Sequence, residues 1–222
     1  MATYEGTHDF TGATVVTVPQ VIVSTCYETQ GRFVEAQAAG GTTIWNTSGA
    51  LVDTSATVSS YKSVSMSGGG SFAYFDQAVS TFACVCEPLT VEGSDFDMFF
   101  GHGEVSISAS AITWTGRHYG FKITEASSGG ETLYGTNADA SSQTETDLST
   151  AVAASVTYMF GARKNGTTDI KFYFGPTLKA THTTNIPAGS ENRPIQCAVT
   201  NKDVASRTAC RMNFASVTYD LV

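Results

Sequence analysis

The segment from Thr157 to Pro187 constrains the fold most, because apolar and polar side chains alternate along it with period two. The dipeptide Asn165-Gly166, a strong hairpin signal, follows the first alternating run, and Gly175-Pro176 ends the second. The apolar residues that share a face in each run are Tyr158, Phe160 and Ala162, then Ile170, Phe172 and Phe174. The pattern predicts an antiparallel β-meander with one apolar face.

The same alternation recurs along most of the chain after residue 61 and predicts further strands. In two of these strands the residues expected to point inward are Phe82, Cys84 and Cys86, and then Phe96, Met98 and Phe100. Further strands are expected at Val105–Trp114, Tyr119–Ile123, Pro194–Thr200 and Thr208–Val222. Glycine, serine and threonine turns separate these runs, and no convincing helical period is present. The sequence therefore predicts an all-β fold.

Three segments depart from this regular alternation. Phe10–Val23 is apolar around Pro19, which removes a ladder donor and predicts an edge strand or two short strands with a bend. Ala126–Thr150 has a loop composition and is expected to form rim loops around at most one short strand. In Thr208–Val222, a break in the alternation near Ala215-Ser216 predicts a bulge. Residues 1–9 are expected to form an extended arm.

Several pieces of the sequence carry a resemblance to a known fold. They are SMSGGGSFAYFD (65–76), FACVCEP (82–88), MFFGHG (98–103), HYGFKI (118–123), ETLYGTNADASSQTETDLS (131–149) and LKATHTTNIP (178–187). Together they resemble concanavalin-like, or laminin-G-like, jelly-roll domains, in the version found in virion proteins of tailed bacteriophages. The resemblance is best over Tyr61–Val222 and implies an antiparallel two-sheet β-sandwich. A length of 222 residues is ordinary for a single such domain, which we expect over residues 1–222. The resemblance also implies that Phe10–Val23 pairs near Arg211–Val222.

Charge and hydropathy narrow the range of partners. The formal net charge is −8 with a sequence pI near 4.8, and there is no run of lysine or arginine, so nucleic acid is a poor partner. No apolar run approaches the roughly 20 residues of a membrane helix. The first ten residues, MATYEGTHDF, lack the pattern of a signal peptide. We therefore expect no membrane partner and synthesis in the host cytoplasm.

The chain has five cysteines, so at least one thiol is unpaired or pairs with another chain. Cys84 and Cys86 are expected side by side on one strand face, where parallel Cβ vectors disfavour a disulfide. Cys197 and Cys210 could oppose each other across the last hairpin, and we expect them to be reduced. No Cys-x-x-Cys pair or Cys-His cluster is present, so no metal and no cofactor is predicted.

Acidic residues and histidines offer little sign of catalysis. Asp95 and Asp97, with Glu92, depart from the Glu-x-Asp-x-x-Glu cluster of sandwich-type glycan hydrolases. A solvated strand face explains them better, and a cation site is the other alternative to catalysis. The histidines are scattered without metal-ligand spacing, and we expect surface or turn positions for His8, His102, His118 and His182. No catalytic residue is predicted.

Aromatic side chains are the candidate ligand-binding residues. An exposed aromatic ring can stack on a sugar, and the candidates for this role are Trp114, Tyr119 and Tyr134, together with Trp45. The alternative for each is packing in the core, which is the commoner use of aromatic residues in a sandwich.

We expect a non-enzymatic structural protein of a tailed-phage virion, above all a capsid decoration protein on the particle exterior. Its partners would be the major capsid protein or other virion proteins, and it would form a homo-oligomer such as a trimer. The alternative is a carbohydrate-binding adhesin or tail-associated receptor-binding module, in which rim loops at Ala126–Thr150 and Ile186–Pro194 meet host surface glycans. A glycan hydrolase is the third reading.

Overall fold

The computed structural model describes residues 20–22, 33–38, 42–46, 49–54, 60–66, 79–89, 96–103, 105–108, 111–125, 131–189, 193–202 and 208–219. All regular elements in these ranges are β-strands. In the described ranges there is also no helix with the length and apolar character to cross a membrane.

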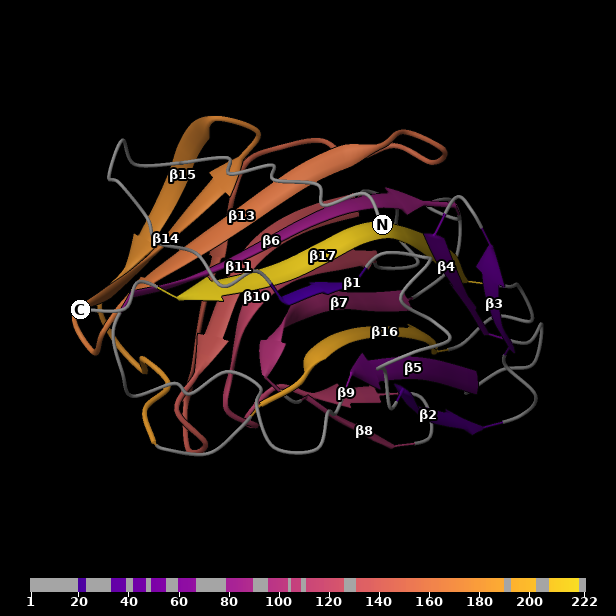
Figure 1. Ribbon diagram of the computed structural model, residues 1–222, viewed down its shortest axis with the longest axis horizontal. Helices are drawn as coiled ribbons and strands as arrows, with labels where there is room; N and C mark the ends of the chain where they lie inside the picture. Colours follow the sequence, from indigo (N-terminus) through magenta and orange to yellow (C-terminus); the bar gives the residue numbers. More distant parts are fainter. Residues whose placement is uncertain are drawn as a thin grey trace.

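The first sheet, sheet A, is antiparallel and has the strand order β15-β14-β13-β6-β17-β4-β3, with β1 pairing on β17 (Figure 1). Its strands are β1 (Gln20–Ile22), β3 (Thr42–Asn46), β4 (Gly49–Asp53), β6 (Val79–Pro88), β13 (Tyr158–Asn165), β14 (Asp169–Phe174), β15 (Thr177–His182) and β17 (Ala209–Tyr219).

The second sheet, sheet B, has the order β12-β11-β10-β7-β16-β5-β2 and is also antiparallel. Its strands are β2 (Phe33–Ala38), β5 (Ser60–Met66), β7 (Phe96–Gly103), β10 (His118–Glu125), β11 (Glu131–Ala138), β12 (Gln143–Asp147) and β16 (Ile195–Asn201). A separate hairpin is formed by β8 (Ser106–Ser108) and β9 (Ala111–Thr113).

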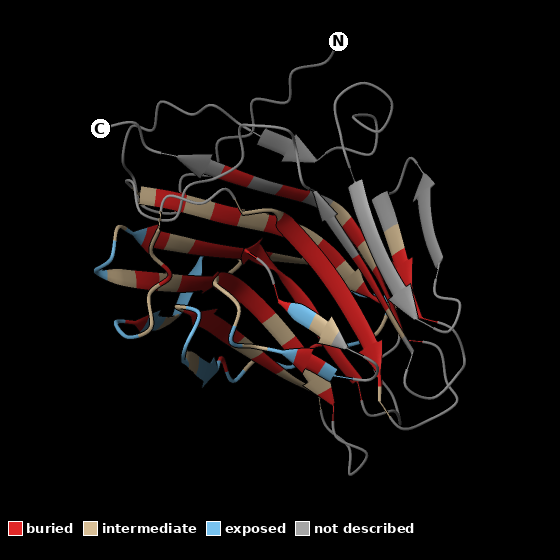
Figure 2. Cartoon of the chain, turned by 90° about the horizontal axis from the view of Figure 1, so that it is seen from below, coloured by how far each residue is buried: buried red, intermediate tan, exposed pale blue. Residues whose placement is uncertain are grey.

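The core lies between the two sheets, as the buried residues of Figure 2 show. Phe160 of sheet A stacks on Phe121 of sheet B with ring centroids 5.0 Å apart, and Phe172 meets Phe121 edge-on at 5.7 Å. The inward residues expected in β6 and β7 are buried here: Phe82, Cys84, Cys86, Phe96, Met98 and Phe100. The predicted antiparallel β-sandwich is confirmed.

The predicted meander is present as β13, β14 and β15. Asn165 pairs with Asp169, and Gly166 between them has φ +55°, a left-handed conformation that glycine adopts readily. Gly175 has φ +54° in the two-residue turn that joins Phe174 to Thr177. The local signals in this segment were therefore sufficient to place both turns.

The prediction of rim loops at Ala126–Thr150 is wrong for most of this segment. Residues 131–147 form a two-stranded extension of sheet B, with β11 pairing on β10 and β12 on β11. The glycine that resembled a loop signal has a packing role, because a Cβ at Gly135 would lie 2.7 Å from Cγ of Phe172. The polar residues of β12 fit a strand at the edge of the sheet.

The described ends of the chain pair largely as expected. Gln20–Ile22 pairs antiparallel with β17, where Gln20 is opposite Val217, which agrees with the expected contact between the first and last strands. The irregularity in β17 lies between Met212 and Phe214, earlier than the expected Ala215-Ser216. The extended arm expected at residues 1–9 is outside the described residues.

Candidate functional site

The surface of interest is the outer face of sheet B, the side turned away from the core. Strand register places alternate residues of β7, β10, β11 and β12 on it, and these include Asp97, Phe99, Gly101, Gly120, Lys122, Thr124, Tyr134, Thr136, Gln143, Glu145 and Asp147. Part of this face is covered by the β8–β9 hairpin, through a small apolar cluster of Phe99, Val105, Ile112 and Ala198.

Two glycines shape the covered part of the face. Gly101 and Gly120 are opposite each other on β7 and β10. A Cβ at Gly101 would lie 2.3 Å from Cζ of Phe99, so the glycine leaves the space that this ring occupies. Trp114 then packs edge-on against Phe99, with centroids 5.9 Å apart. Trp114 is half-buried and stands where the hairpin leads back into β10.

Next to this cluster, a lysine lies between two aromatic rings. Nζ of Lys122 is 5.0 Å from the ring centroid of Trp114 and 5.0 Å from that of Tyr134. The same ammonium donates to both carboxylate oxygens of Glu145, at 3.0 and 3.1 Å. Cation–π and ionic contacts therefore hold Lys122 from three sides. We call Trp114, Lys122, Tyr134 and Glu145 the aromatic clamp.

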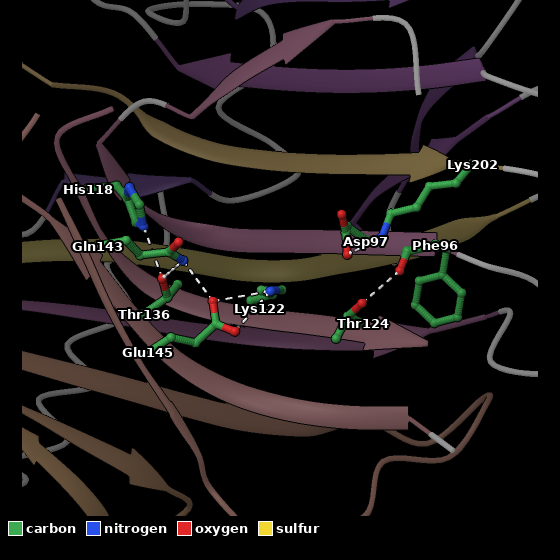
Figure 3. Close-up of polar contacts among 9 residues, drawn as sticks. All are labelled: Phe96, Asp97, His118, Lys122, Thr124, Thr136, Gln143, Glu145 and Lys202. Atoms are coloured by element: carbon green, nitrogen blue, oxygen red, sulfur yellow. Dashed lines mark hydrogen bonds and ion pairs between the residues drawn. The ribbon is translucent and has the colours of Figure 1, made fainter. Parts of the chain in front are cut away.

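A chain of hydrogen bonds connects the clamp to a buried histidine (Figure 3). Gln143 Nε2 donates to Glu145 Oε2 at 2.7 Å and to Thr136 Oγ1 at 3.0 Å. Thr136 Oγ1 is 3.2 Å from His118 Nε2, and His118 Nδ1 is 2.7 Å from the carbonyl oxygen of Gly116. Since a carbonyl only accepts, Nδ1 carries the proton and Nε2 accepts from Thr136. These hydrogen bonds hold Glu145 in place, and Glu145 in turn holds Lys122.

His118, the buried histidine of this hydrogen-bond network, is uncharged at neutral pH. Burial lowers the pKa of His118 to about 4, against a partly offsetting hydrogen bond to Gly116. The uncharged ring keeps the acceptor nitrogen that Thr136 requires.

The structure separates the three aromatic residues expected to bind sugar. Trp114 and Tyr134 are half-buried and lie on either side of Lys122 on the outer face of sheet B. The prediction for Tyr119 is wrong, because its side chain points into the core with no exposed surface and its hydroxyl lies 2.9 Å from Ser80 Oγ. The side chain of Trp45 is outside the described residues.

The surface or turn positions expected for three histidines are also wrong. His102, His118 and His182 lie in strands and are buried. His182 contacts Asn137 Oδ1 through Nδ1 at 2.5 Å and Thr146 Oγ1 through Nε2 at 2.9 Å, and so joins the edges of the two sheets. Burial lowers the pKa of His182 to about 4 and that of His102 to about 3. His8 is outside the described residues.

The acidic residues that we weighed for catalysis do not form a described cluster. Asp97 is on the outer face of sheet B, and Lys202 Nζ lies 3.0 Å from its Oδ1. The solvated position expected for Asp97 is wrong, because the residue is only 4% exposed. Glu92 and Asp95 are outside the described residues. Within the described ranges, no group of three or more His, Cys, Asp or Glu residues could hold a metal ion.

The expected cysteine geometry needs correction. Cys197 is in β16 of sheet B and Cys210 is in β17 of sheet A, so the two residues face each other between the sheets rather than across a hairpin. Their Sγ atoms are 3.4 Å apart. Cys84, Cys86, Cys197 and Cys210 are buried free thiols.

Sequence reasoning missed Lys122, Gln143 and Glu145. The only available signal was the alternation in QTETD, which puts Gln143, Glu145 and Asp147 on one face of a strand. That signal carries no information on which partner strand supplies the cation, since Lys122 is 23 residues away from Glu145.

No protein-family model and no curated protein matches the chain. Solved structures of similar fold do match. The CBM2 module of the evolved Dit protein of Lactobacillus casei BL23 phage J-1 has a TM-score of 0.56 and 11% identity, covering 91% of this chain and 95% of its own. The potassium-bound carbohydrate recognition domain of Emp46p has a TM-score of 0.53 and 12% identity, covering 86% of this chain and 89% of its own. This chain has a lectin-like β-sandwich fold.

A third match is to botulinum neurotoxin type C, whose cell entry depends on interaction with two ganglioside molecules. It has a TM-score of 0.50 and 9% identity, covering 86% of this chain and 44% of the toxin chain. At these identities the similarity establishes the fold.

Proposed function

We propose that the protein is a non-enzymatic carbohydrate-binding module of a tailed-phage particle, and that it binds an uncharged glycan of the host surface on the outer face of sheet B. The aromatic clamp is the observation that carries this proposal. Trp114 and Tyr134 are partly exposed aromatic residues whose remaining ring surface can meet the C–H faces of a sugar. Gln143 and Glu145 offer amide and carboxylate groups for its hydroxyls.

The charges on this face favour an uncharged ligand. The ammonium groups of Lys122 and Lys202 are each paired with a carboxylate, Glu145 and Asp97 respectively. The chain as a whole carries a net charge of −8. An anionic sugar would have to compete with these carboxylates for the lysines, whereas a neutral sugar needs only hydroxyl hydrogen bonds and ring stacking.

The same pairing argues for binding rather than hydrolysis. Both oxygens of Glu145 accept from Lys122, and Oε2 accepts from Gln143 as well. A glycosidase needs a carboxyl oxygen directed at the glycosidic oxygen, whereas both oxygens of Glu145 are directed at neighbouring side chains.

The phage setting is supported by the sequence resemblance and by the similarity to a phage Dit module. The role expected first from the sequence was capsid decoration. None of the similar structures described above is a capsid decoration protein, so this role stays a prediction. Contacts with the major capsid protein and assembly as a homo-oligomer also stay predictions. A monodisperse monomer at micromolar concentration in light scattering would contradict the latter.

Glycan-array screening followed by calorimetry tests the proposal. Neutral host polysaccharides should bind, and Trp114→Ala or Tyr134→Ala should each weaken binding about three- to tenfold, as expected for loss of one aromatic contact. Leu178→Ala is the matched control, since Leu178 is 49% exposed on β15 of the other sheet. Binding confined to sialylated or phosphorylated glycans, or unaffected by both aromatic substitutions, would refute the proposal.

A further inference from the structure

Two thiols meet between the sheets. Cys197 of sheet B and Cys210 of sheet A have no exposed surface, and their sulfur atoms are 3.4 Å apart. A disulfide joins Cα atoms that are roughly 4.4–6.8 Å apart and needs a sulfur–sulfur distance of about 2.05 Å. The sulfurs would therefore have to approach by about 1.4 Å.

We propose that Cys197 and Cys210 form a disulfide that links the two sheets covalently when the chain folds in the presence of a small-molecule disulfide such as oxidised glutathione. One thiolate attacks the oxidant, forms a mixed disulfide and releases one molecule of reduced glutathione. The second thiolate then attacks the protein sulfur of that mixed disulfide and releases the other. Two protein thiols lose two protons and two electrons, and one oxidised glutathione becomes two reduced molecules.

The other described thiols are less suited to this bond. Cys84 and Cys86 are two residues apart on the inner face of β6, so their Cβ vectors are parallel. Cys210 and Cys197 approach from opposite sheets, with their side chains directed toward each other, and their thiols are hydrogen-bonded. The facing pair therefore has the geometry that a bridge requires.

The timing of the reaction follows from burial. The hydrogen bond with Cys197, together with burial, raises the pKa of the Cys210 thiol, and burial raises that of Cys86. A thiol of this kind is protonated and shielded in the folded protein, so it reacts slowly. The bridge should form while the two sheets are packing together, before the thiols are fully shielded, and once formed it should resist reductants.

Peptide mapping of the full chain tests the proposal. The protein is unfolded and reduced, refolded with reduced and oxidised glutathione, alkylated and digested with trypsin. Cleavage after Lys202 and Arg207 places Cys197 and Cys210 on different peptides. We expect these peptides to be joined, and the bridge to survive dithiothreitol unless denaturant is added. The melting temperature should exceed that of the reduced protein by about 5–10 °C.

Cys84→Ala/Cys86→Ala is the matched control, because it removes the neighbouring thiols and should leave the linked peptides intact. Cys210→Ala should abolish both the linked peptides and the difference in melting temperature. If one of these variants fails to fold, mapping of the unchanged chain still decides. Alkylation of both Cys197 and Cys210 after oxidative refolding, or a link from either residue to the β6 peptide, would overturn the proposal.

Discussion

Gly135 of β11 lies beneath the ring of Phe172 of β14, so that a Cβ at position 135 would be only 2.7 Å from Cγ of Phe172. This contact spans the core and joins the two sheets. Glycine is needed at position 135 because the ring approaches the backbone closely. Its φ is not positive, in contrast to Gly166 and Gly175.

Gly135→Ala should destabilise the fold by about 1–3 kcal/mol, because the added methyl group displaces a buried ring. Phe172→Leu combined with Gly135→Ala should cost less than the sum of the two single changes, since the smaller side chain makes room. A double-mutant cycle from urea denaturation measures this coupling. Strict additivity of the two changes would contradict the packing argument.

A substitution in the aromatic clamp should affect glycan binding more than the stability of the fold. The side chains of Lys122 and Glu145 are 13% and 26% exposed, so their ion pair is partly screened. Lys122→Met should therefore change the free energy of unfolding by about 1 kcal/mol or less. It should weaken glycan binding, because Trp114 and Tyr134 lose the cation that holds both rings. Calorimetry and thermal melts of the same sample separate the two effects, and a large loss of stability with unchanged affinity would contradict this assignment.

Tyr119→Phe should lower the stability of the fold and leave glycan binding unchanged. Removing the hydroxyl breaks the buried hydrogen bond with Ser80, which should cost about 1–2 kcal/mol of stability. Glycan affinity should not change, since Tyr119 has no surface on the outer face of sheet B. Urea denaturation and calorimetry on the variant check both statements. A specific loss of affinity in Tyr119→Phe would show that the binding surface lies elsewhere.

The buried histidines predict loss of stability in mild acid. The pKa is lowered from 6.5 to about 4 for His118 and His182, and to about 3 for His102. Between pH 6.5 and these values the unfolded chain binds protons that the folded chain does not, so stability falls as pH falls. The upper limit is about 1.4 kcal/mol per pH unit for each histidine.

Urea midpoints measured from pH 7 to pH 4 check this slope. His182→Gln should make it shallower, because the glutamine cannot take up a proton. Aspartate and glutamate residues remain as a common background in both proteins, so the difference between the two slopes isolates His182. A urea midpoint that does not change between pH 7 and pH 5 would contradict the prediction.

Local sequence signals were sufficient where the structure depends on neighbouring residues. Asn165-Gly166 and Gly175-Pro176 placed both turns of the meander, because a positive φ favours glycine whatever surrounds it. Alternation also put Tyr119 on the same face as Phe121 and Ile123, so the evidence for its burial was present in the sequence. Its aromatic character alone does not indicate exposure.

The sequence by itself determined that this chain alternates with period two, turns at glycines and forms antiparallel sheets. Only the tertiary structure decided that Lys122 lies between Trp114 and Tyr134, and that Cys197 meets Cys210 between the sheets. The period of a strand specifies which face a side chain points to. It does not specify which strand becomes its neighbour or which residue of the other sheet it meets, because that depends on how the whole core closes.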